Sequence, residues 1–488
     1  MGRHSLVEDP PLVIDLVEEA PATAPIHVPA RRAATTTPRS APVIPQPRTG
    51  NTHSGELPRV APEHRLFSRW AETGQPAGLD EHLDRFGPLP RAEFARRRGA
   101  EALLELTERA GLRGRGGAGF PLARKMASVV ESRNGRRRPV LVANGCEGDP
   151  TSRKDRLLMY AAPHLVLDGM ALAAHAVGAE QSMLCLGRGS RLLEPLEAAI
   201  AERTDDPADV HPVTVPHRYV ASEASALVNF LTNGDARPTG PRPLPSERGV
   251  QGRPTLVANV ETLAHLALIA RNGADWFRAR GTPESPGTML VTVAGAVRRA
   301  GVHEVDLGAP AGQLLRLAGG TDGPSPAVLL GGLGGGWLPL PAAENLALAH
   351  RECAEAGVGL GVASVVALPA EACGVTVTAE IARYLAEESA RQCGPCMFGL
   401  PAVAEDMRAL ADGEVDEALA QRLHRRLAVI PRRGACAHPD GSVRLVNSAL
   451  RVFADDVAEH LSGRPCRRAG ATALPLLGSL TSDREDWT

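Results

Sequence analysis

The chain has 488 residues, of which 43% are hydrophobic, and a formal net charge of −2. This length allows two or three domains with substantial cores, and a charge so near neutral gives no reason to expect nucleic acid as a partner. We find no run of about 18 apolar residues and no secretory signal pattern at the N-terminus, so membrane insertion and secretion are not expected. Eight cysteines in so long a chain indicate a reduced, cytoplasmic protein with a metal or redox site rather than a disulfide scaffold.

The first half of the chain predicts a disordered extension followed by an α/β domain. Residues 1–62 are rich in Pro, Ala, Thr and Arg and show little apolar periodicity. Residues 63–275 alternate apolar runs with helical periodicity, which predicts Rossmann-like layers. The expected strands are Pro139–Ala143, Ser182–Leu186 and Pro212–Val215. The expected helices are Arg91–Ala110, Leu157–Val177, Arg191–Arg203 and one that opens over Glu223–Leu231.

The second half changes character twice. Residues 285–345 contain alternating, turn-punctuated stretches around a short helix, which predicts a small α+β module like a β-grasp. Its expected elements lie in Gly287–Val305, Ala311–Leu317 and Ala327–Gly332. Residues 365–464 are helical in pattern and predict a small bundle, whereas the tail 465–488 has no persuasive pattern. The expected helices of the bundle are Glu380–Ser389, Met397–Ala411, Val415–Leu427 and Ser448–Leu461.

A glycine loop, GLRGRGGAGFPLARK, follows the helix that ends at Gly111. It contains G-x-G-x-x-G, but a helix rather than a strand precedes it, so the usual dinucleotide fingerprint does not apply. Successive glycines still let backbone N–H groups approach a phosphate or a flat ring, and Arg113, Arg115 and Lys125 supply positive charge. A purely structural turn is the alternative interpretation.

A second polar segment, NGCEGDPTSRKD, follows the first expected strand. Asn144 stands where α/β proteins bind ligands, and Glu147 and Asp149 could accept hydrogen bonds from ribityl or ribose hydroxyls. A solvated acidic turn is the alternative. The chain carries 54 basic residues but only two lysines, Lys125 and Lys154, one in each polar segment. Since Lys and Arg are not interchangeable at a tight site, this retention suggests that the amine is needed, with chance as the alternative.

Three cysteines suggest a metal centre. Cys393 and Cys396 form a C-x-x-C, and with Cys436 they could hold Zn²⁺ or an iron–sulfur cluster. A dithiol redox pair is less favoured because no strand precedes the motif as in thioredoxins, and unrelated buried thiols are the remaining alternative. We expect Cys185 and Cys353 to be core residues and Cys466 a bystander.

Together these segments resemble the flavoprotein subunit of respiratory complex I and its relatives in NAD-linked hydrogenases and formate dehydrogenases. GLRGRGGAGFP is similar to the family signature, and NGCEGDPTSRKDR to N-A-D-E-G-E-P-G-x-x-K-D-R. YVASEASAL is similar to Y-x-x-G-E-E-T-A-L, PTLVANVETL to P-T-V-V-N-N-V-E-T-L, and ESARQCGPCMFG to E-S-C-G-x-C-x-P-C-R-x-G. The resemblance runs from about Leu103 to Leu461 in consistent order and implies an SLBB fold for the central module.

The resemblance implies an enzyme like NADH dehydrogenase (quinone). NADH or NADPH would reduce non-covalent FMN, and electrons would pass to a [4Fe-4S] cluster and on to a quinone- or ferredoxin-linked partner, such as an iron–sulfur subunit of a peripheral membrane complex. The expected FMN contacts are Gly114, Arg115, Gly116, Gly117, Lys125, Asn144, Glu147, Tyr219, Glu223 and Asn259. The expected catalytic residues are Glu147 and Phe120, the latter as a stacking ring, and the expected cluster ligands are Cys393, Cys396 and Cys436.

The chain departs from the family pattern at both sites. Ala390 replaces the first cluster cysteine, which leaves the fourth ligand to Cys373, His438, water or a partner group, or else implies a [3Fe-4S] core. Near the nicotinamide, Ala224 replaces an acidic residue and Leu244 an aromatic one. Cys146 replaces an aspartate and Ala258 an asparagine. The alternative hypothesis is therefore a donor-switched or non-catalytic electron-relay homologue that keeps the fold.

Overall fold

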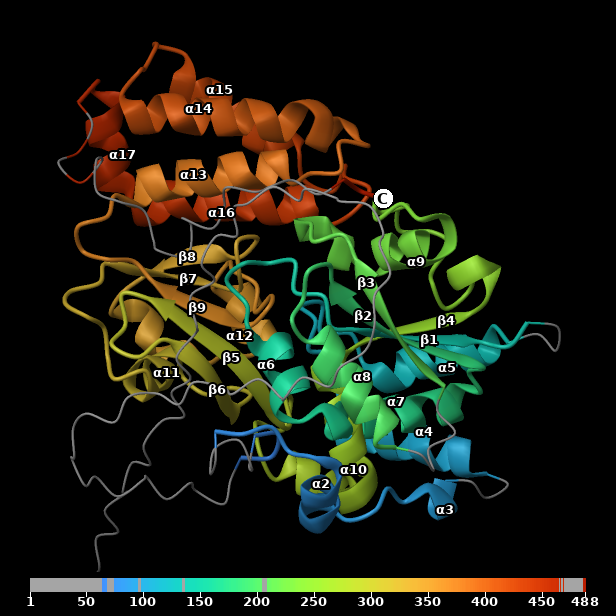
Figure 1. Cartoon of the computed structure of the whole chain (residues 1–488). Coiled ribbons are helices and arrows are strands. Elements are labelled where there is room, and N and C mark those ends of the chain that lie inside the picture. Colours follow the sequence, from blue (N-terminus) through green and yellow to red (C-terminus); the bar gives the residue numbers. More distant parts are fainter. Residues whose placement is uncertain are drawn as a thin grey trace, which may run out of the picture.

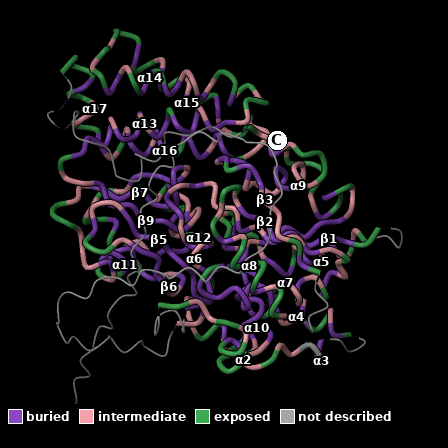
Figure 2. The backbone as a smooth tube through the Cα atoms, in the orientation of Figure 1, coloured by how far each residue is buried: buried purple, intermediate pink, exposed green. Residues whose placement is uncertain are grey.

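This computed structural model describes residues 64–67, 74–94, 98–133, 137–203, 209–464, 466, 468 and 486–488. The predicted disordered extension (1–62) and most of the 465–488 tail lie outside these ranges. Two sheets lie side by side, and a layer of helices lies above the second of them (Figure 1). Figure 2 shows that the buried stretches run through both sheets and the helices that cover them. This arrangement places the predicted α/β, α+β and helical segments against one another.

The first sheet is parallel, with strand order β3-β2-β1-β4. Its strands are β1 (Val140–Asn144), β2 (Gln181–Gly187), β3 (Val210–Val215) and β4 (Thr255–Asn259). The three predicted strands are confirmed, and β4 is an additional strand that pairs with β1. In that pairing Asn144 is level with Asn259. The parallel sheet therefore brings two asparagines together at its carboxyl edge.

Two predicted helices prove to be broken. The predicted helix Leu157–Val177 is instead α6 (Lys154–Ala161) and α7 (Pro163–Val177), which meet at 97°. Proline lacks an N–H and keeps the residue before it out of the helical region, and Ala162 has φ −140°. The predicted helix Arg91–Ala110 is α3 (Arg91–Phe94) and α4 (Gly99–Ala110). The other helices of this part are α2 (Leu79–Phe86), α5 (Leu122–Glu131), α8 (Leu193–Ala201), η1 (Tyr219–Ser222), α9 (Ala224–Asn233), η2 (Val250–Gly252) and α10 (Val260–Arg278).

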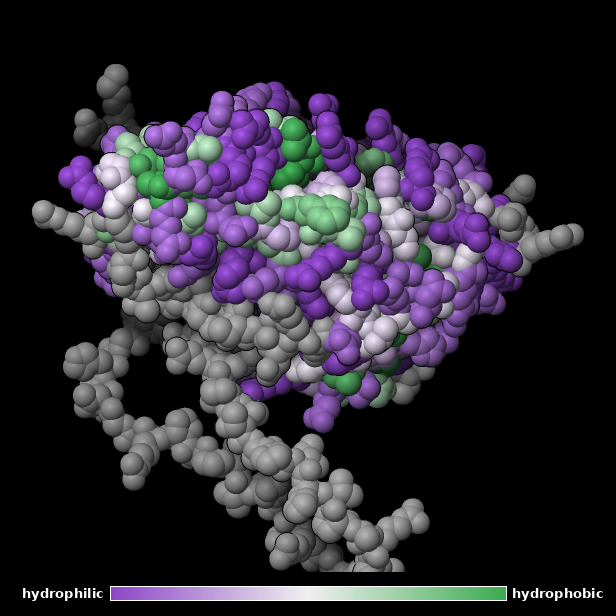
Figure 3. All heavy atoms as spheres, turned by 90° about the horizontal axis from the view of Figure 1, so that it is seen from above, coloured by the Kyte–Doolittle hydropathy of each residue, from purple (hydrophilic) through white to green (hydrophobic). Residues whose placement is uncertain are grey.

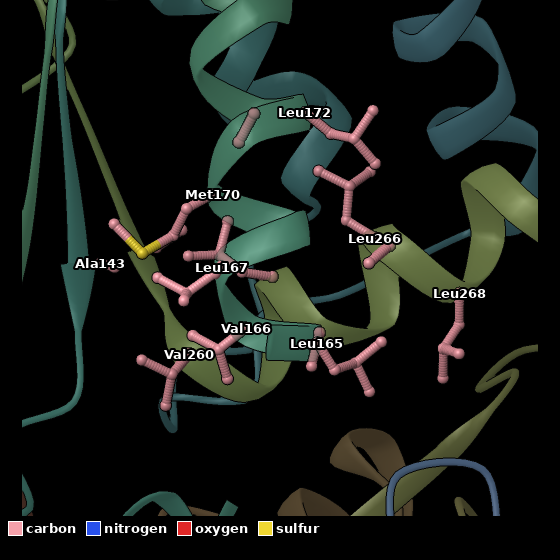
Figure 4. Packing of buried hydrophobic residues seen from close by; sticks show 14 of the residues in the cluster. Ala143, Leu165, Val166, Leu167, Met170, Leu172, Val260, Leu266 and Leu268 are labelled. Carbon is pink, nitrogen blue, oxygen red and sulfur yellow. The ribbon is translucent and has the colours of Figure 1, made fainter. Parts of the chain in front are cut away.

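Helices α7 and α10 pack closely against each other and form the main core beside the first sheet. Figure 4 shows Leu165 and Val166 of α7 near Val260 and Leu266 of α10. The close approach depends on Gly169, because a Cβ at this position would clash with the backbone carbonyl of Leu263. The core that supports the carboxyl edge of the sheet therefore requires glycine at position 169.

We expect Gly169→Val to lower the thermal unfolding midpoint strongly, since overpacking a tight core costs about 1–3 kcal/mol or more. Gly78→Val is the matched control, because a Cβ there meets nothing within 4 Å. Circular dichroism melts of the two variants and the parent chain provide the comparison. Equal midpoints for all three proteins would contradict the close helix contact.

The second sheet is mixed, with strand order β6-β5-β9-β7-β8. Its strands are β5 (Thr288–Gly295), β6 (Gly301–Asp306), β7 (Ala327–Leu330), β8 (Gly336–Pro339) and β9 (Ser364–Ala367). Strand β9 lies between β5 and β7, although it follows the predicted end of the module at residue 345. The helices α11 (Ala311–Leu317), η3 (Ala342–Asn345) and α12 (His350–Glu355) accompany the sheet. The α+β character is observed, and the SLBB assignment stays a prediction.

The C-terminal helices form the layer above the second sheet (Figure 1). They are α13 (Gly374–Glu387), η4 (Pro395–Gly399), α14 (Leu400–Asp412), α15 (Leu419–Val429), α16 (His438–Val452) and α17 (Ala454–Leu461). The predicted helix Ser448–Leu461 is divided at Phe453, whose φ of −107° separates α16 from α17. A π-helical turn, η4, precedes α14 and carries Cys396.

Among the described residues no single helix is both long and apolar enough to cross a membrane, and α6 and α7 meet those requirements only as a bent pair.

Candidate functional site

The carboxyl edge of β1 and β4 is held by a network around Asn144 and Asn259. Asn259 donates to the Asn144 carbonyl at 3.4 Å and to Asp155 Oδ2 at 2.6 Å, and its own oxygen accepts from the Glu261 N–H at the start of α10. Asn144 donates to Ser222 O at 2.8 Å. Both amides are thus fixed by the protein at the point where the sequence predicts a ligand.

The glycine loop lies directly against this edge. A Cβ at Gly116 would come within 3.3 Å of the Asn259 Cβ, and Gly117 has φ +105°, which disfavours other residues. The loop closes on itself through the Gly114 N–H, which donates to Phe120 O at 2.9 Å. Phe120 leaves its side chain 49% exposed beside the loop. The loop therefore presents bare backbone and one open aromatic ring.

Arg115 points away from the loop's open side. Its guanidinium is buried and donates to Thr288 O at 3.0 Å, and its backbone N–H donates to the Thr262 hydroxyl. Burial lowers its pKa to about 10 despite the opposing charge of Glu261. The side chain joins the loop to β5, and its predicted FMN contact stays a prediction.

The ammonium of Lys125 has more N–H donors than it uses in hydrogen bonds to the described residues. Its half-buried ammonium donates to Val257 O at 3.0 Å, the one hydrogen bond it makes among the described residues. Burial lowers its pKa, and the charge of Glu223 opposes that shift. An ammonium carries three N–H donors, so two remain for a ligand. The predicted contact of Lys125 with FMN stays a prediction.

The acidic turn after β1 is engaged with the protein. Glu147 accepts from the Ser152 hydroxyl at 2.8 Å and from the Asp155 and Arg156 N–H groups, so it caps the start of α6. Its predicted catalytic role therefore stays a prediction. Asp149 accepts from the Leu333 N–H at 2.8 Å and from the Tyr219 hydroxyl at 3.3 Å. Asp149 thus fastens the turn to a loop of the second sheet and to Tyr219.

A buried charge cluster beneath the edge was not predicted from the sequence. Lys154 Nζ lies 2.6 Å from Asp155 and 2.9 Å from Glu261, and all three side chains are at most 7% exposed. Burial opposes the charge of Lys154, but the two carboxylates outweigh it and raise its pKa. Burial likewise opposes the charge of Glu261, but Lys154, His265 and Arg115 together outweigh it and lower the pKa of Glu261 to about 2. The unusual retention of lysine was the sequence signal for this cluster, although its partner 107 positions away was not visible.

Replacing Lys154 by methionine should destabilise the fold strongly. Removing one partner of a buried ion pair costs about 3–5 kcal/mol because the remaining charge is uncompensated. Lys154→Arg keeps the charge and should lose less. Thermal unfolding of the two variants tests this, and a Lys154→Met protein as stable as the parent would show that the cluster is dispensable.

The predicted metal cysteines come together. Cys393 follows α13, Cys396 lies in η4 and Cys436 precedes α16. Cys396 lies within electrostatic range of both Cys393 and Cys436. Burial raises the pKa of the Cys396 and Cys436 thiols. Three converging thiols fit an iron–sulfur cluster, which would bind them as thiolates.

The structure excludes one of the predicted fourth ligands. Cys373 precedes the first turn of α13, whereas Cys393 follows its last. A 14-residue helix is about 20 Å long, so the proposal of Cys373 as a cluster ligand is wrong. His438 lies two residues after Cys436, and its Nε2 contacts Leu385 O at 2.8 Å. Only its Nδ1 would be available to iron.

Comparisons with known proteins agree with this geometry. Residues 107–268 match the Nuo51 FMN-binding domain, and residues 376–460 match the NADH-ubiquinone oxidoreductase-F iron–sulfur binding region. The NADH-quinone oxidoreductase F subunits of Salmonella typhimurium and Escherichia coli are each 32% identical over 419 residues, which cover 82% of this chain and 93% of each relative. The chain belongs to the family of NADH-quinone oxidoreductase F subunits.

A solved relative has a similar fold. The crystal structure of an NAD⁺-reducing [NiFe]-hydrogenase in the air-oxidised state matches with a TM-score of 0.72 and 31% identity. The match covers 83% of this chain and 70% of that chain. The resemblance inferred from short motifs therefore extends over both sheets and the helical layer.

Two residues lie between the FMN-binding region and the cysteines of this family member. Tyr219 and Cys393 both pack against the hydrophobic cluster that includes Cys396, and the ring centroid of Tyr219 lies 5.3 Å from that of His438. Glu223 caps α9 by accepting from the Ser225 and Ala226 N–H groups. Its negative charge lies within electrostatic range of Lys125 and of Cys436 and favours the protonated form of each. One carboxylate thus acts electrostatically on both the lysine that follows the glycine loop and one of the three cysteines.

The structure shows where the residues that depart from the family pattern lie. Ala390 lies in the loop between α13 and Cys393, beside the hydrogen-bonded Ser389. Ala224 is the first residue of α9, and Leu244 is 39% exposed. Cys146 follows β1, where burial raises the pKa of its thiol.

Proposed function

We propose that this chain is the electron-entry subunit of an NADH-oxidising system, in which NADH reduces FMN at the carboxyl edge of the first sheet. Electrons then pass to an iron–sulfur cluster at Cys393, Cys396 and Cys436. When bound, FMN supplies the conversion of a two-electron donor into single-electron steps. The observation that carries the proposal is the position of Glu223, whose charge lies within electrostatic range both of Lys125, which follows the glycine loop, and of Cys436.

The chain's own residues have distinct roles in this proposal. Gly116 and Gly117 allow the backbone to approach the ligand, and Lys125 binds the phosphate with its two free donors. Asn144 and Asn259 fix the edge of the sheet. Phe120 offers a half-exposed ring on which a nicotinamide can stack. Tyr219 shields the space between flavin and thiols from water.

The decisive experiment is an anaerobic titration of the purified flavoprotein with NADH and with NADPH. We expect NADH to bleach the flavin, but more slowly than in relatives that keep the residues lost at Ala224 and Leu244. Each missing hydrogen bond or stacking contact costs about 1 kcal/mol. Ala224→Glu should accelerate reduction.

One result would oppose the proposal, and another would oppose only the expectation of slow reduction. Flavin that stays oxidised in both titrations would favour the second candidate function, a donor-switched or non-catalytic electron relay, which the same two lost residues support. Saturable reduction at low NADH with no gain in Ala224→Glu would show that the nicotinamide site is complete by another route.

Gly116→Val should abolish FMN binding. A Cβ at position 116 would lie only 3.3 Å from the Cβ of Asn259, so a branched side chain must displace the loop or occupy the space of the ligand. Gly78→Val, whose Cβ meets nothing within 4 Å, should retain the flavin. Flavin released by heating and measured by fluorescence gives the occupancy and identifies FMN or FAD. Full flavin occupancy in Gly116→Val would show that the glycine loop does not contribute to the flavin site.

Ala390→Cys should restore a four-thiolate cluster. Iron–sulfur potentials depend on ligand charge and exposure, so the added anionic thiolate should lower the potential and slow loss of iron in air. Iron counting, EPR and redox titration after anaerobic reconstitution measure this, with Cys353→Ala as a control at a thiol outside the site. Stoichiometric zinc without iron in the parent, or unchanged iron content in Cys396→Ala, would exclude the cluster.

We further propose that electrons leave to an iron–sulfur protein subunit of a cytoplasmic or membrane-peripheral complex. Met397 and Phe398, directly after Cys396, are 48% and 71% exposed. Figure 3, which shows the molecule from above, has hydrophobic patches among hydrophilic side chains. Apolar surface beside a cluster suits contact with a partner.

A further inference from the structure

A second group of metal-ligating side chains lies at the other end of α13 from the three cluster cysteines. Cys373 precedes α13, His460 lies in the last turn of α17, and Cys466 follows that helix. The two sulfurs and one imidazole nitrogen lie within 4.8 Å of one another. Their exposures are 1%, 0% and 7%. Neither the FMN region nor the cluster cysteines share a residue with this group.

The geometry of the group matches tetrahedral zinc. Cys373 Sγ lies 3.5 Å from His460 Nε2. Zinc binds sulfur at about 2.3 Å and imidazole nitrogen at about 2.0–2.1 Å, so a tetrahedral angle separates these two ligand atoms by about 3.6 Å. The observed separation therefore needs almost no adjustment to accept the ion. Cys466 would complete a set of two thiolates and one imidazole.

The imidazole is already oriented as a ligand. His460 Nδ1 lies 3.0 Å from Leu410 O, which fixes the proton on that nitrogen and directs the Nε2 lone pair toward the sulfurs. Metal-binding histidines commonly donate their second nitrogen to a backbone carbonyl in this way. The present partners of Nε2 are long, a thiol at 3.5 Å and the Cys466 N–H at 3.3 Å. A cation would bind this lone pair more strongly than either donor.

The surrounding charge supports thiolate ligands. Arg468 pairs with Asp456 of α17 at 2.5 and 2.7 Å, which holds the segment carrying Cys466 against the helix. Arg468 also lies within electrostatic range of both Cys373 and Cys466. By contrast, Cys353 lies in a hydrophobic cluster, and among the described residues its thiol makes one hydrogen bond, to Ala347 O at 3.9 Å. Cys353 shows what an ordinary core thiol looks like in this fold.

We propose that Cys373, His460 and Cys466 bind a structural divalent cation of the zinc type, with water or another donor in the fourth position. The ion would fasten the chain after α17 to the start of α13. Binding releases the two thiol protons to solvent and involves no change of oxidation state. The site is independent of the proposed electron transfer.

The test is the metal content of the full-length protein, purified without chelator and then titrated with Zn²⁺ or with Co²⁺ as a spectroscopic probe. We expect stoichiometric zinc, and for cobalt the thiolate charge-transfer and intense d–d absorption of a tetrahedral site. Cys373→Ser and Cys466→Ser should lose this zinc and these bands while retaining iron and flavin. Cys393→Ser should lose iron but keep the zinc and the flavin, and Cys353→Ser should keep all three.

Stability supplies a second measurement. Chelation should lower the thermal midpoint of the parent protein but not that of Cys373→Ser. Three outcomes would overturn the proposal: a protein that binds neither Zn²⁺ nor Co²⁺, zinc retained in both serine variants, or a Cys373–Cys466 disulfide found by mass spectrometry. Loss of iron in Cys393→Ser, or of flavin in Gly116→Val, would concern only the proposed electron transfer and would leave the proposed zinc site unaffected.

Discussion

The buried ammonium of Lys154 is the interaction on which the architecture of the site depends. It lies between Asp155 of α6 and Glu261 of α10, and Glu261 also accepts from the Leu290 N–H of β5 at 2.8 Å. Asp155 in turn accepts from Asn259 at the end of β4. One charge cluster therefore joins the first sheet, its covering helices and the second sheet. Buried charges are tolerated only when paired, so these elements must assemble in the arrangement that pairs Lys154 with both carboxylates. The same arrangement positions the glycine loop, because Gly116 lies against Asn259.

The sequence predicted the parts whose signals are local. Strands β1 to β3 are short apolar runs, and the glycine loop and the cysteine pair are contiguous motifs. Strand β4 was not predicted because its five residues lead directly into the apolar first turns of α10, with no break in the pattern. Pro163 was visible, but helical periodicity on both sides outweighed it, and tertiary packing sets the 97° bend.

The parts that could not be predicted depend on distance in the folded chain. Arg115 has the same sequence signature as a phosphate-binding arginine, yet its guanidinium bonds to carbonyls of residues more than 170 positions away. Cys373 stands only 20 positions before Cys393, which made it a reasonable fourth ligand. A helix converts that short separation into opposite ends of α13, so the same residue belongs instead with His460 and Cys466.

The shared carboxylate of Glu223 links the two halves of the redox site electrostatically. Its oxygen is held by the first N–H groups of α9, where the positive end of the helix favours a negative charge. A fixed charge there stabilises the ammonium of Lys125 and opposes further negative charge at Cys436. A cluster with three thiolates places one negative charge fewer near that carboxylate than a cluster with four. The replacement of cysteine by Ala390 therefore reduces repulsion where electrons must arrive, and it does so without changing the residues that hold the flavin.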